Sequence, residues 1–316
     1  MSSPNIRCIK RKKEKEEESK EGSPVDVADF ISHVEEYSRN GNELFGKEFD
    51  HLKKECPHPS TAEALLPINV KKVRYIKLPP VDRTRVQLQY TGQEGSEFIN
   101  ANYMPGNFFA NEYIATQGPM GFTRNDFWRM VWEQGITAIV MLTKCYDKDV
   151  EKCNHYWPEN VQEPWKYGEI LVDITKQTIE KEWTVTEMDV TRGEETRNIT
   201  HFHFTAWPDF GVPKRPKSLI DFLKLVNKNM RRGGAPLLAH CSAGIGRTGT
   251  FLTLDITSQQ IENNNGIDVF GTIRRLRNCR IEMVETLDQY IFIHKCLEEL
   301  IKEQQQNVYS IYLANK

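Results

Sequence analysis

The sequence predicts a single α/β domain, because helix-like and strand-like segments alternate along it with no internal repeat and no long linker. Its 316 residues are 39% hydrophobic and 27% charged, which is enough for one substantial core. With 42 basic and 44 acidic residues the net charge is -2, and this near-neutrality argues against a general nucleic-acid binder. Seven Cys without regular spacing do not suggest a disulfide framework. We therefore expect a soluble, cytoplasmic protein with mostly free thiols.

The N-terminal residues 1–25 have no apolar periodicity, and we expect them to form a disordered tail. A basic run between Arg7 and Lys15 is followed by glutamates up to Glu21. The tail is either simply solvated or a juxtamembrane segment whose basic cluster contacts anionic lipid at the inner face of the plasma membrane. The predicted domain spans residues 26–304 and a C-terminal tail spans 305–316. In that tail, Tyr309 and Tyr312 are either phosphorylation sites or exposed tyrosines without function.

The first half of the domain combines amphipathic helices with short strands. Apolar residues recur at helical spacing over Val27–Tyr37 and Leu44–Leu52, and three prolines make residues 56–70 loop-like. A helix is expected over Thr123–Gln134, followed by the buried strand Ile136–Leu142. The short strands expected before that helix are Tyr75–Leu78, Arg85–Gln89, Phe98–Met104 and Glu112–Thr116.

The second half begins with β-rich segments and ends with helices. The expected strands are Glu169–Thr175, Trp183–Val190, Asn198–Ala206 and the short apolar run Pro236–His240. The expected helices are Ser218–Met230, Arg247–Asn263, Val269–Asn278 and Leu287–Glu303. The order is therefore mixed, which is typical of an α/β sheet protein.

Residues 236–249 (PLLAHCSAGIGRTG) contain the pattern with the clearest chemistry. An apolar strand leads into a glycine-containing loop and then into a helix, an arrangement that turns backbone N–H groups inward as an anion nest. Arg247 adds a planar fork that fits two phosphate oxygens. The positive field of the helix end favours the thiolate form of Cys241. A thiolate beside a bound phosphate monoester is a nucleophile in position to attack.

Other interpretations of this segment remain open at the level of residues alone. Cys241 could be a buried structural thiol. His240 and Cys241 could form half of a metal site with Cys153 and His155, although that spacing fits no common zinc pattern. The glycines could belong to an ordinary strand–helix turn.

The string HCSAGIGRTG at residues 240–249 closely resembles the signature of the cysteine-dependent protein tyrosine phosphatases. The resemblance extends over almost the whole domain. The matching segments are 73–86 (VRYIKLPPVDRTRV), 98–104 (FINANYM), 113–119 (YIATQGP), 126–132 (DFWRMVW), 152–158 (KCNHYWP), 204–213 (FTAWPDFGVP) and 287–294 (LDQYIFIH). Details at 127–132, 261–265 and 269–271 are most similar to the density-enhanced group of receptor-type enzymes, which have one intracellular phosphatase domain. The resemblance implies a highly twisted mixed sheet flanked by helices on both faces.

The resemblance also implies the catalytic roles. Cys241 would be the nucleophile that forms a phosphocysteine, and Arg247 would bind the phosphate and the charged transition state. Asp209 would protonate the leaving tyrosine oxygen and then deprotonate the hydrolytic water; taken alone, it would be a solvated turn residue. Thr248 resembles the hydroxyl residue that hydrogen-bonds the leaving thiolate. No metal or organic cofactor is required, because the nest and Arg247 supply the electrophilic stabilisation.

Further residues are implied to bind substrate or support the site. Tyr75 resembles the aromatic wall of the phosphotyrosine pocket, its alternative being a core aromatic on a strand. Arg277 and Arg280 resemble supporting residues near the phosphate loop, although by themselves they indicate a solvated helix face. The other phosphate- or water-binding residues are Ser242, Ala243, Gly244, Ile245, Gly246, Glu285 and Gln289, and the supporting residues are His240, Trp207 and Lys152.

Several positions depart from the family pattern. Glu285 stands where the family usually has the Gln that holds the hydrolytic water, and a carboxylate there would face the phosphoryl charge. Lys77 replaces an Asp or Asn that contacts the substrate backbone, and Val73 replaces an Asn. Asp147 stands where a Glu commonly pairs with Lys152, and Glu282 occupies the pocket gateway. These changes suggest altered substrate choice, slower turnover, or both.

Three functions follow from these residues. The first is an active phosphatase acting on phosphotyrosine-containing proteins. The second is a weakly active or inactive domain that binds phosphotyrosine, which Glu285 and Lys77 favour and the intact Cys241, Arg247 and Asp209 oppose. The third is a phosphoinositide phosphatase, with a pocket entry reshaped by Lys77 and Glu282.

Overall fold

A computed structural model describes the chain except residues 1–22, 57–58, 209, 231–232, 264–265 and 315–316. Two expectations therefore lie outside the described residues: the conformation of the basic tail and the position of Asp209. The side chains of Tyr309 and Tyr312 also lie outside that part of the structure.

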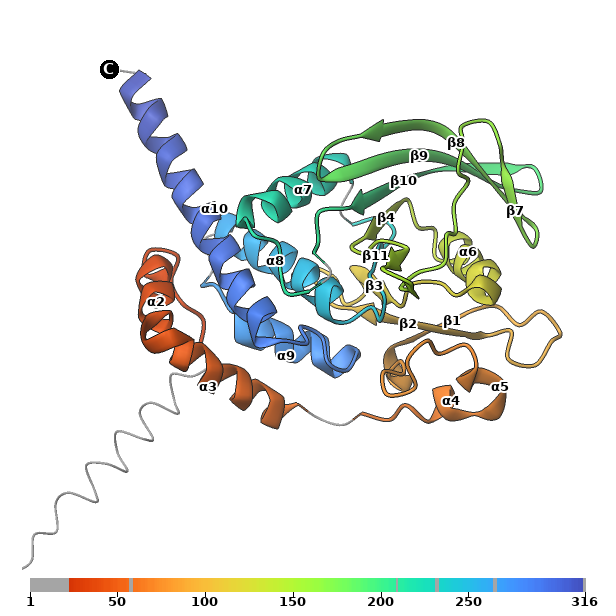
Figure 1. The fold of residues 1–316 in the computed structure, drawn as a ribbon, viewed down its shortest axis with the longest axis horizontal. Helices are drawn as coiled ribbons and strands as arrows, with labels where there is room; N and C mark the ends of the chain where they lie inside the picture. Colours follow the sequence, from red (N-terminus) through yellow and green to blue (C-terminus); the bar gives the residue numbers. More distant parts are fainter. Residues whose placement is uncertain (1–22, 57–58, 209, 231–232, 264–265, 315–316) are drawn as a thin grey trace, which may run out of the picture.

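The described residues form a nine-stranded mixed sheet at the centre of the molecule (Figure 1). An inner strand, β11 (Leu237–His240), pairs in parallel with both of its neighbours. A third parallel pairing joins β4 (Ala138–Met141) to β10 (Glu195–Phe204), and the other five pairings of the sheet are antiparallel. The strands in spatial order are β1 (Arg85–Gln87), β2 (Phe98–Met104), β3 (Tyr113–Thr116), β11, β4 (Ala138–Met141), β10 (Glu195–Phe204), β9 (Trp183–Arg192), β8 (Ile170–Ile179) and β7 (Trp165–Tyr167). The expected mixed sheet is confirmed.

Helices cover both faces of this sheet, and each face has its own hydrophobic cluster (Figure 1). Successive residues of β11 alternate between the clusters, Leu237 and Ala239 facing one and Leu238 the other. Helix α6 (Arg124–Glu133) packs in the second cluster. The helices of the first cluster are α7 (Pro216–Asn229), α8 (Gly246–Glu262), α9 (Val269–Cys279) and α10 (Leu287–Ala314).

Two N-terminal helices, α2 (Phe30–Tyr37) and α3 (Arg39–Glu55), pack against α10. Their apolar positions include the buried side chains of Phe30, Phe45 and Phe49. Immediately before them, Val25 exchanges backbone hydrogen bonds of 2.9 and 2.8 Å with Ile267. Val25, which was expected to be the last residue of the disordered tail, is therefore fixed to the domain.

The local structure differs from the expectations where long-range contacts override sequence pattern. Residues Tyr75–Leu78 form a turn closed by a 2.8 Å bond from the Leu78 N–H to the Tyr75 carbonyl, so the predicted strand is wrong. The expected loop 56–70 contains α4 (Ala62–Leu65) and α5 (Pro67–Val70). Helix α10 continues to Ala314, through most of the expected tail. Strand β7 and the hairpin β5 (Tyr146–Asp147) and β6 (Val150–Glu151) were not expected.

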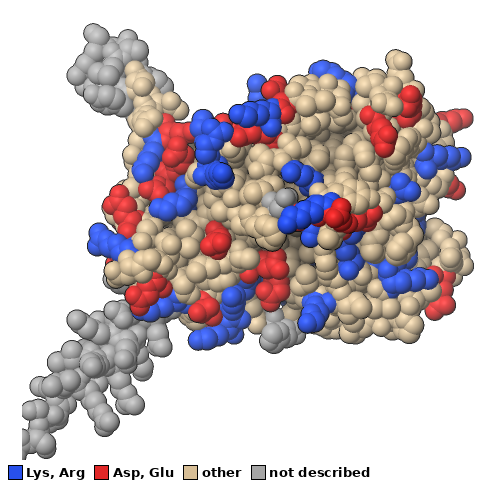
Figure 2. Space-filling view, viewed as in Figure 1, with Lys and Arg blue, Asp and Glu red and all other residues tan. Residues whose placement is uncertain are grey.

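The charged side chains are interspersed over the face of the molecule seen in Figure 2, with no large area of a single sign. This distribution agrees with the near-zero net charge of -2.

Within the described part of the chain, no helix combines the length and the apolar character that crossing a bilayer requires.

Candidate active site

The site is built where β11 ends and α8 begins, at the C-terminal edge of the parallel strands. Cys241 follows the last residue of β11 and is only 5% exposed. The loop can close tightly because Gly244 has φ +72°, and a Cβ there would lie 2.1 Å from the Thr116 carbonyl oxygen. Any side chain at this position would therefore force the loop away from β3.

The first turn of α8 keeps its N–H groups free of side-chain caps. The N-cap residue is Ile245, whose side chain has no oxygen to accept from them. The first helical hydrogen bond runs from the Gly249 N–H to the Ile245 carbonyl at 2.7 Å. The start of α8 can therefore donate several N–H groups to an anion, and its dipole favours negative charge there.

The loop between Cys241 and α8 is held from outside by Arg280, which is fully buried. Its Nε donates to the Gly244 carbonyl at 2.8 Å and its Nη2 to the Ala243 carbonyl at 2.9 Å. Its Nη1 donates to Asn102 Oδ1 at 2.8 Å. Burial lowers the pKa of the guanidinium to about 10, so it stays charged at neutral pH. The solvated helix face suggested by sequence pattern alone is wrong for this residue.

His240 supports the base of the loop through a buried hydrogen-bond chain. Its Nδ1 lies 3.0 Å from the Cys241 carbonyl oxygen, which can only accept, so Nδ1 carries the proton. Its Nε2 therefore accepts from the Tyr156 hydroxyl at 2.7 Å, and Tyr156 in turn lies 2.8 Å from Nε2 of His201. Burial lowers the pKa of His240 to about 4, which keeps the ring neutral.

Among the described residues, no group of three or more His, Cys, Asp or Glu is placed to hold a metal.

Arg247 connects the phosphate loop to the segment that precedes Asp209. Its Nη2 donates to the Pro208 carbonyl at 3.1 Å, and its guanidinium carbon lies 5.7 Å from the centre of the Trp207 ring. Trp207 is buried, and its Nε1 donates to the Gly211 carbonyl at 3.1 Å. Beyond Asp209, whose position is not described, the Phe210 side chain is 79% exposed.

Tyr75 forms one wall of a cavity of about 430 Å³ that also contains Cys241 and Arg247. Its hydroxyl lies 3.0 Å from Ser242 Oγ. Because Ser242 gives its only hydroxyl proton to the Lys152 carbonyl at 2.7 Å, the Tyr75 hydroxyl must be the donor. The Lys152 ammonium lies 3.8 Å from Asp147, the pairing that the sequence suggested. Tyr75 is thus a partly exposed pocket wall and not a core aromatic.

Glu285 and Gln289 lie over the start of α8. A Cβ placed on Gly246 would lie 3.0 Å from Glu285 Oε2 and 2.8 Å from Gln289 Nε2, so both side chains point to the phosphate loop. Gln289 Oε1 accepts from the Glu285 N–H at 2.9 Å, and Gln289 is one of the residues that line the cavity. Thr248 is buried, and its hydroxyl has no hydrogen-bond partner among the described residues.

The backbone before Glu285 is strained. Val284 has φ +59°, a rare conformation for a β-branched residue. Arg277 holds it by donating from Nε to the Met283 carbonyl at 2.9 Å and from Nη2 to the Val284 carbonyl at 2.7 Å. Arg277 is 2% exposed, so the solvated helix face suggested by its residue type is wrong here too.

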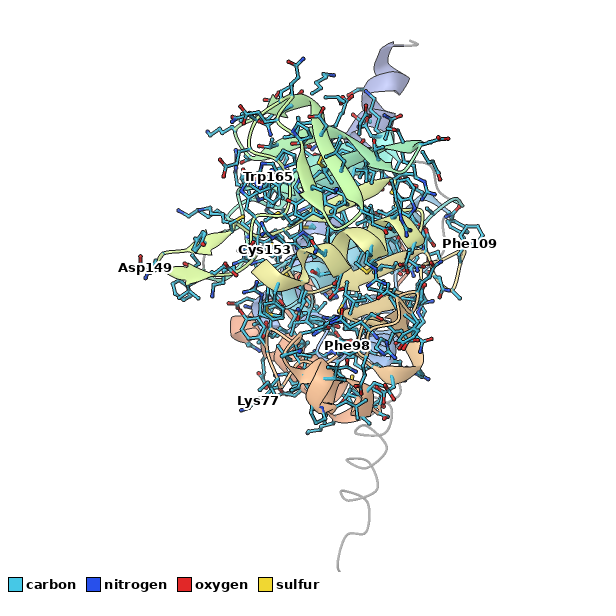
Figure 3. All side chains as sticks on the ribbon, turned by 90° about the vertical axis from the view of Figure 1, so that its right-hand side faces the viewer. Lys77, Phe98, Phe109, Asp149, Cys153 and Trp165 are labelled. Atoms are coloured by element: carbon cyan, nitrogen blue, oxygen red, sulfur yellow. The ribbon has the colours of Figure 1, made fainter. Side chains whose placement is uncertain are left out.

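Arg74 is a site residue that the residue-level reasoning did not identify. It fixes the turn that presents Tyr75, by donating to the carbonyls of Gly118 at 3.2 Å and Pro119 at 2.8 Å. It also pairs with Glu151 at 3.2 Å. Its place inside the matched segment 73–86 was the available signal. Two residues near Arg74 that differ from the family pattern lie in different surroundings. Val73 is buried, whereas Lys77 projects from the periphery in Figure 3.

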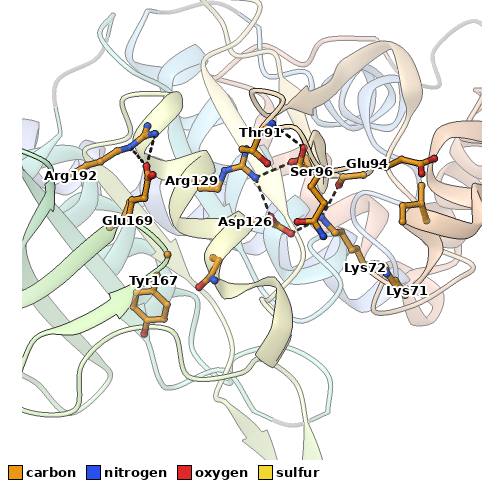
Figure 4. A pocket seen from close by; sticks show the side chains of 16 residues that line it. Lys71, Lys72, Thr91, Glu94, Ser96, Asp126, Arg129, Tyr167, Glu169 and Arg192 are labelled. Atoms are coloured by element: carbon orange, nitrogen blue, oxygen red, sulfur yellow. Dashed lines mark hydrogen bonds and ion pairs between the residues drawn. The ribbon is translucent and has the colours of Figure 1, made fainter.

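A second hollow, of about 440 Å³, lies beside α6 (Figure 4), and Cys241 is not among the residues that line it. Three of its cations are paired within the wall: Lys72 and Arg129 with Asp126 at 2.8 and 3.4 Å, and Arg192 with Glu169 at 3.0 Å. These pairs stabilise the wall, and this hollow lacks the thiol and the backbone nest of the first.

A nucleophilic thiol at the mouth of an anion nest, beside a guanidinium, is the arrangement of a cysteine-dependent phosphatase. Residues 69–299 match the family described as Protein-tyrosine phosphatase, and the chain belongs to this family. It is 38% identical over 285 residues to the human "Phosphatidylinositol phosphatase PTPRQ", covering 90% of this chain and 12% of that protein. It is 38% identical over 300 residues to the Gallus gallus "Receptor-type tyrosine-protein phosphatase eta", covering 94% and 21%. It is 41% identical over 285 residues to the Rattus norvegicus "Receptor-type tyrosine-protein phosphatase V", covering 89% and 17%.

These comparisons confirm the predicted family and its receptor-type affinity. The chain spans about a fifth or less of the length of these relatives. The match covers most of the residues expected to form the domain.

Proposed function

We propose that the protein hydrolyses phosphotyrosine in proteins through a phosphocysteine intermediate. The observation that carries this proposal is the place of Cys241, at the end of a parallel strand and below the uncapped start of α8. In the first step the Cys241 sulfur attacks phosphorus while Asp209 protonates the departing tyrosine oxygen. Arg247 and the loop N–H groups stabilise the phosphoryl oxygens, where negative charge is held in the transition state.

In the second step a water molecule attacks the phosphocysteine and returns the thiolate. Asp209 takes a proton from that water, and the Gln289 amide orients it. The buried Thr248 hydroxyl, which lacks a partner among the described residues, would donate to the departing sulfur. Glu285 is directed to the same space, so its negative charge opposes the phosphoryl group and slows this step.

The substrate class follows from the pocket walls. Tyr75 can stack on a phenyl ring, and its hydroxyl is fixed to Ser242 at 3.0 Å. The similarity to a relative named as a phosphatidylinositol phosphatase favours a second candidate substrate, an inositol phospholipid. However, Glu285 and Asp288 line the cavity, and two carboxylates would repel a headgroup with several phosphates. We therefore favour phosphotyrosine, with the binding-module function as the alternative if turnover is negligible.

One experiment distinguishes these functions. Single-turnover assays would compare a phosphotyrosine peptide with an inositol phospholipid in vesicles. We expect rapid formation of one equivalent of dephosphorylated tyrosine peptide and little phosphate from the lipid. Cys241→Ser should abolish release while peptide binding persists, and Cys145→Ser should behave as the unmodified protein. Release of lipid phosphate alone would establish a phosphoinositide phosphatase, and peptide binding without release would establish the binding module.

We also propose that the domain acts in the cytoplasm, next to the plasma membrane. The receptor-type relatives support this location, and the basic residues between Arg7 and Lys15 could contact anionic lipid. Co-sedimentation with phosphatidylserine vesicles at low and high salt tests the contact. A chain lacking residues 1–22 should lose a salt-sensitive binding that the full chain has.

A further inference from the structure

A buried tyrosine–carboxylate pair connects helix α3 to the first turn of α10. The Tyr290 hydroxyl donates to Glu48 Oε2 at 2.7 Å. Tyr290 is fully buried and Glu48 is 5% exposed. A buried carboxylate is costly unless hydrogen bonds hold it, so such a pair persists only in a well-determined geometry. Burial and the Glu48 charge raise the pKa of Tyr290 well above its usual value, so the hydroxyl keeps its proton and remains the donor.

Aromatic rings fix the Tyr290 side chain from several directions. The Phe49 ring centre lies 5.5 Å away, and Phe45 meets Tyr290 edge-on at 6.2 Å. Both come from α3, whereas His294, at 4.8 Å, lies one turn along α10. Burial lowers the pKa of His294 to about 3, so this ring adds no charge at neutral pH. The position of the Tyr290 ring therefore depends on how α3 packs.

The residue before Tyr290 is Gln289, the side chain that reaches Gly246 at the phosphate loop. Consecutive residues of a helix project about 100° apart and are rigidly coupled through the backbone. Rotation of the first turn of α10 about its axis would therefore displace the Gln289 amide. The Tyr290–Glu48 bond resists this rotation, because it ties the residue next to Gln289 to helix α3, while Gln289 itself lines the cavity.

We propose that Glu48 and Tyr290 are positioning residues that set Gln289 for hydrolysis of the phosphocysteine. The inference rests on the proposed function. It makes the N-terminal helix α3 part of the active-site support, although Glu48 contacts none of the reacting groups. The first chemical step uses Cys241, Arg247 and Asp209, so it should not depend on this bond.

The test measures the two steps separately by rapid quench with a phosphotyrosine peptide. The first variant is Tyr290→Phe, which keeps the ring and removes the donor. The double variant Glu48→Met with Tyr290→Phe avoids leaving a buried carboxylate without this donor. Glu48→Gln keeps an acceptor for the hydroxyl and serves as the rescue. The matched control is Tyr113→Phe, because the buried Tyr113 hydroxyl also donates to a buried carboxylate, Asp255, at 2.8 Å.

We expect phosphocysteine decay to slow about tenfold in Tyr290→Phe and in the double variant, because a small displacement of a positioned group is costly. Tyrosine release should change less than twofold, and Glu48→Gln and Tyr113→Phe should retain normal decay. Normal decay in Tyr290→Phe, or equal slowing of both steps, would overturn the inference alone. Absence of a phosphocysteine in the unmodified protein would instead overturn the proposed function and this inference with it.

Discussion

The Arg280 guanidinium donates from Nε to the carbonyl oxygen of Gly244 at 2.8 Å, from outside the phosphate loop. In a trans peptide unit the carbonyl oxygen and the following N–H point in opposite directions. With the carbonyls of Ala243 and Gly244 directed to Arg280, the next two N–H groups face the concave side of the loop. A cation outside the loop thus orients the donors that bind an anion inside it.

Replacement of Arg280 by Lys should destroy this orientation, because one ammonium cannot reproduce three donors in a planar fork. We expect the free energy of unfolding to fall by about 2–4 kcal/mol, since buried carbonyls lose their partners. Phosphotyrosine turnover should fall by roughly 100-fold. Urea denaturation and steady-state kinetics measure both effects. Arg275→Lys, at an exposed position of the preceding helix α9, is the control, and equal behaviour of the two variants would contradict the role of Arg280.

Asp209→Ala should lower kcat for phosphotyrosine by about 100-fold or more, because the tyrosine oxygen then leaves without a proton. An aryl phosphate whose leaving group is already a stable anion should be affected much less. The measurement is kcat for a series of aryl phosphates of different leaving-group pKa. Asp149→Ala, on the turn of the β5–β6 hairpin, should leave the series unchanged. Equal losses across the series would show that Asp209 is not the acid.

Glu285→Gln should raise the steady rate of substrate hydrolysis and reduce the initial burst of leaving group. The carboxylate can only accept hydrogen bonds, whereas an amide can donate to the phosphoryl oxygens. A tenfold gain would correspond to about 1.4 kcal/mol off the barrier of the second step. Stopped-flow measurement of burst and steady rate checks this expectation, with Glu282→Gln as the control for general charge. If burst and steady rate stay unchanged, Glu285 does not limit hydrolysis.

Acid should destabilise the fold before its carboxylates are protonated. Burial lowers the pKa of both His203 and His240 to about 4, below the 6.5 of an exposed imidazole. Between these values the unfolded chain binds more protons, so stability is lost as the pH falls from about 6.5 to 4. From pH 7 to 5.5 we expect each histidine to contribute a loss of roughly 1 kcal/mol in the free energy of unfolding. His203→Gln should flatten the urea-derived pH profile by about this amount, and parallel profiles would contradict it.

The phosphate loop was predictable because its elements are local. The strand β11, the glycine turn and the start of α8 are consecutive, and each follows from residues within a few positions. The observed β11 and α8 match their expected ranges to about one residue, within the uncertainty of any helix or strand boundary. The family resemblance was similarly contained in short contiguous motifs.

The turn at Tyr75 was not predictable from alternation of residue types. Its short run of apolar residues has the composition of a strand, but Arg74 binds carbonyls of Gly118 and Pro119 and holds the chain in a turn. These partners lie more than forty positions away in sequence. A pattern within a window of ten residues contains no information about such a partner.

The sequence by itself determined the family, the nucleophile motif and the alternating order of helices and strands, because local periodicity and contiguous motifs encode them. Only the tertiary structure decided that Arg277 and Arg280 are buried, since the last turn of α9 and the residue after it place these guanidiniums against carbonyls of other segments. It also decided the contact between Glu48 and Tyr290. The physical reason is the same for Arg277, Arg280 and Glu48. A charged side chain is buried only where backbone or side-chain groups form hydrogen bonds with it, and the fold brings those groups together from distant parts of the sequence.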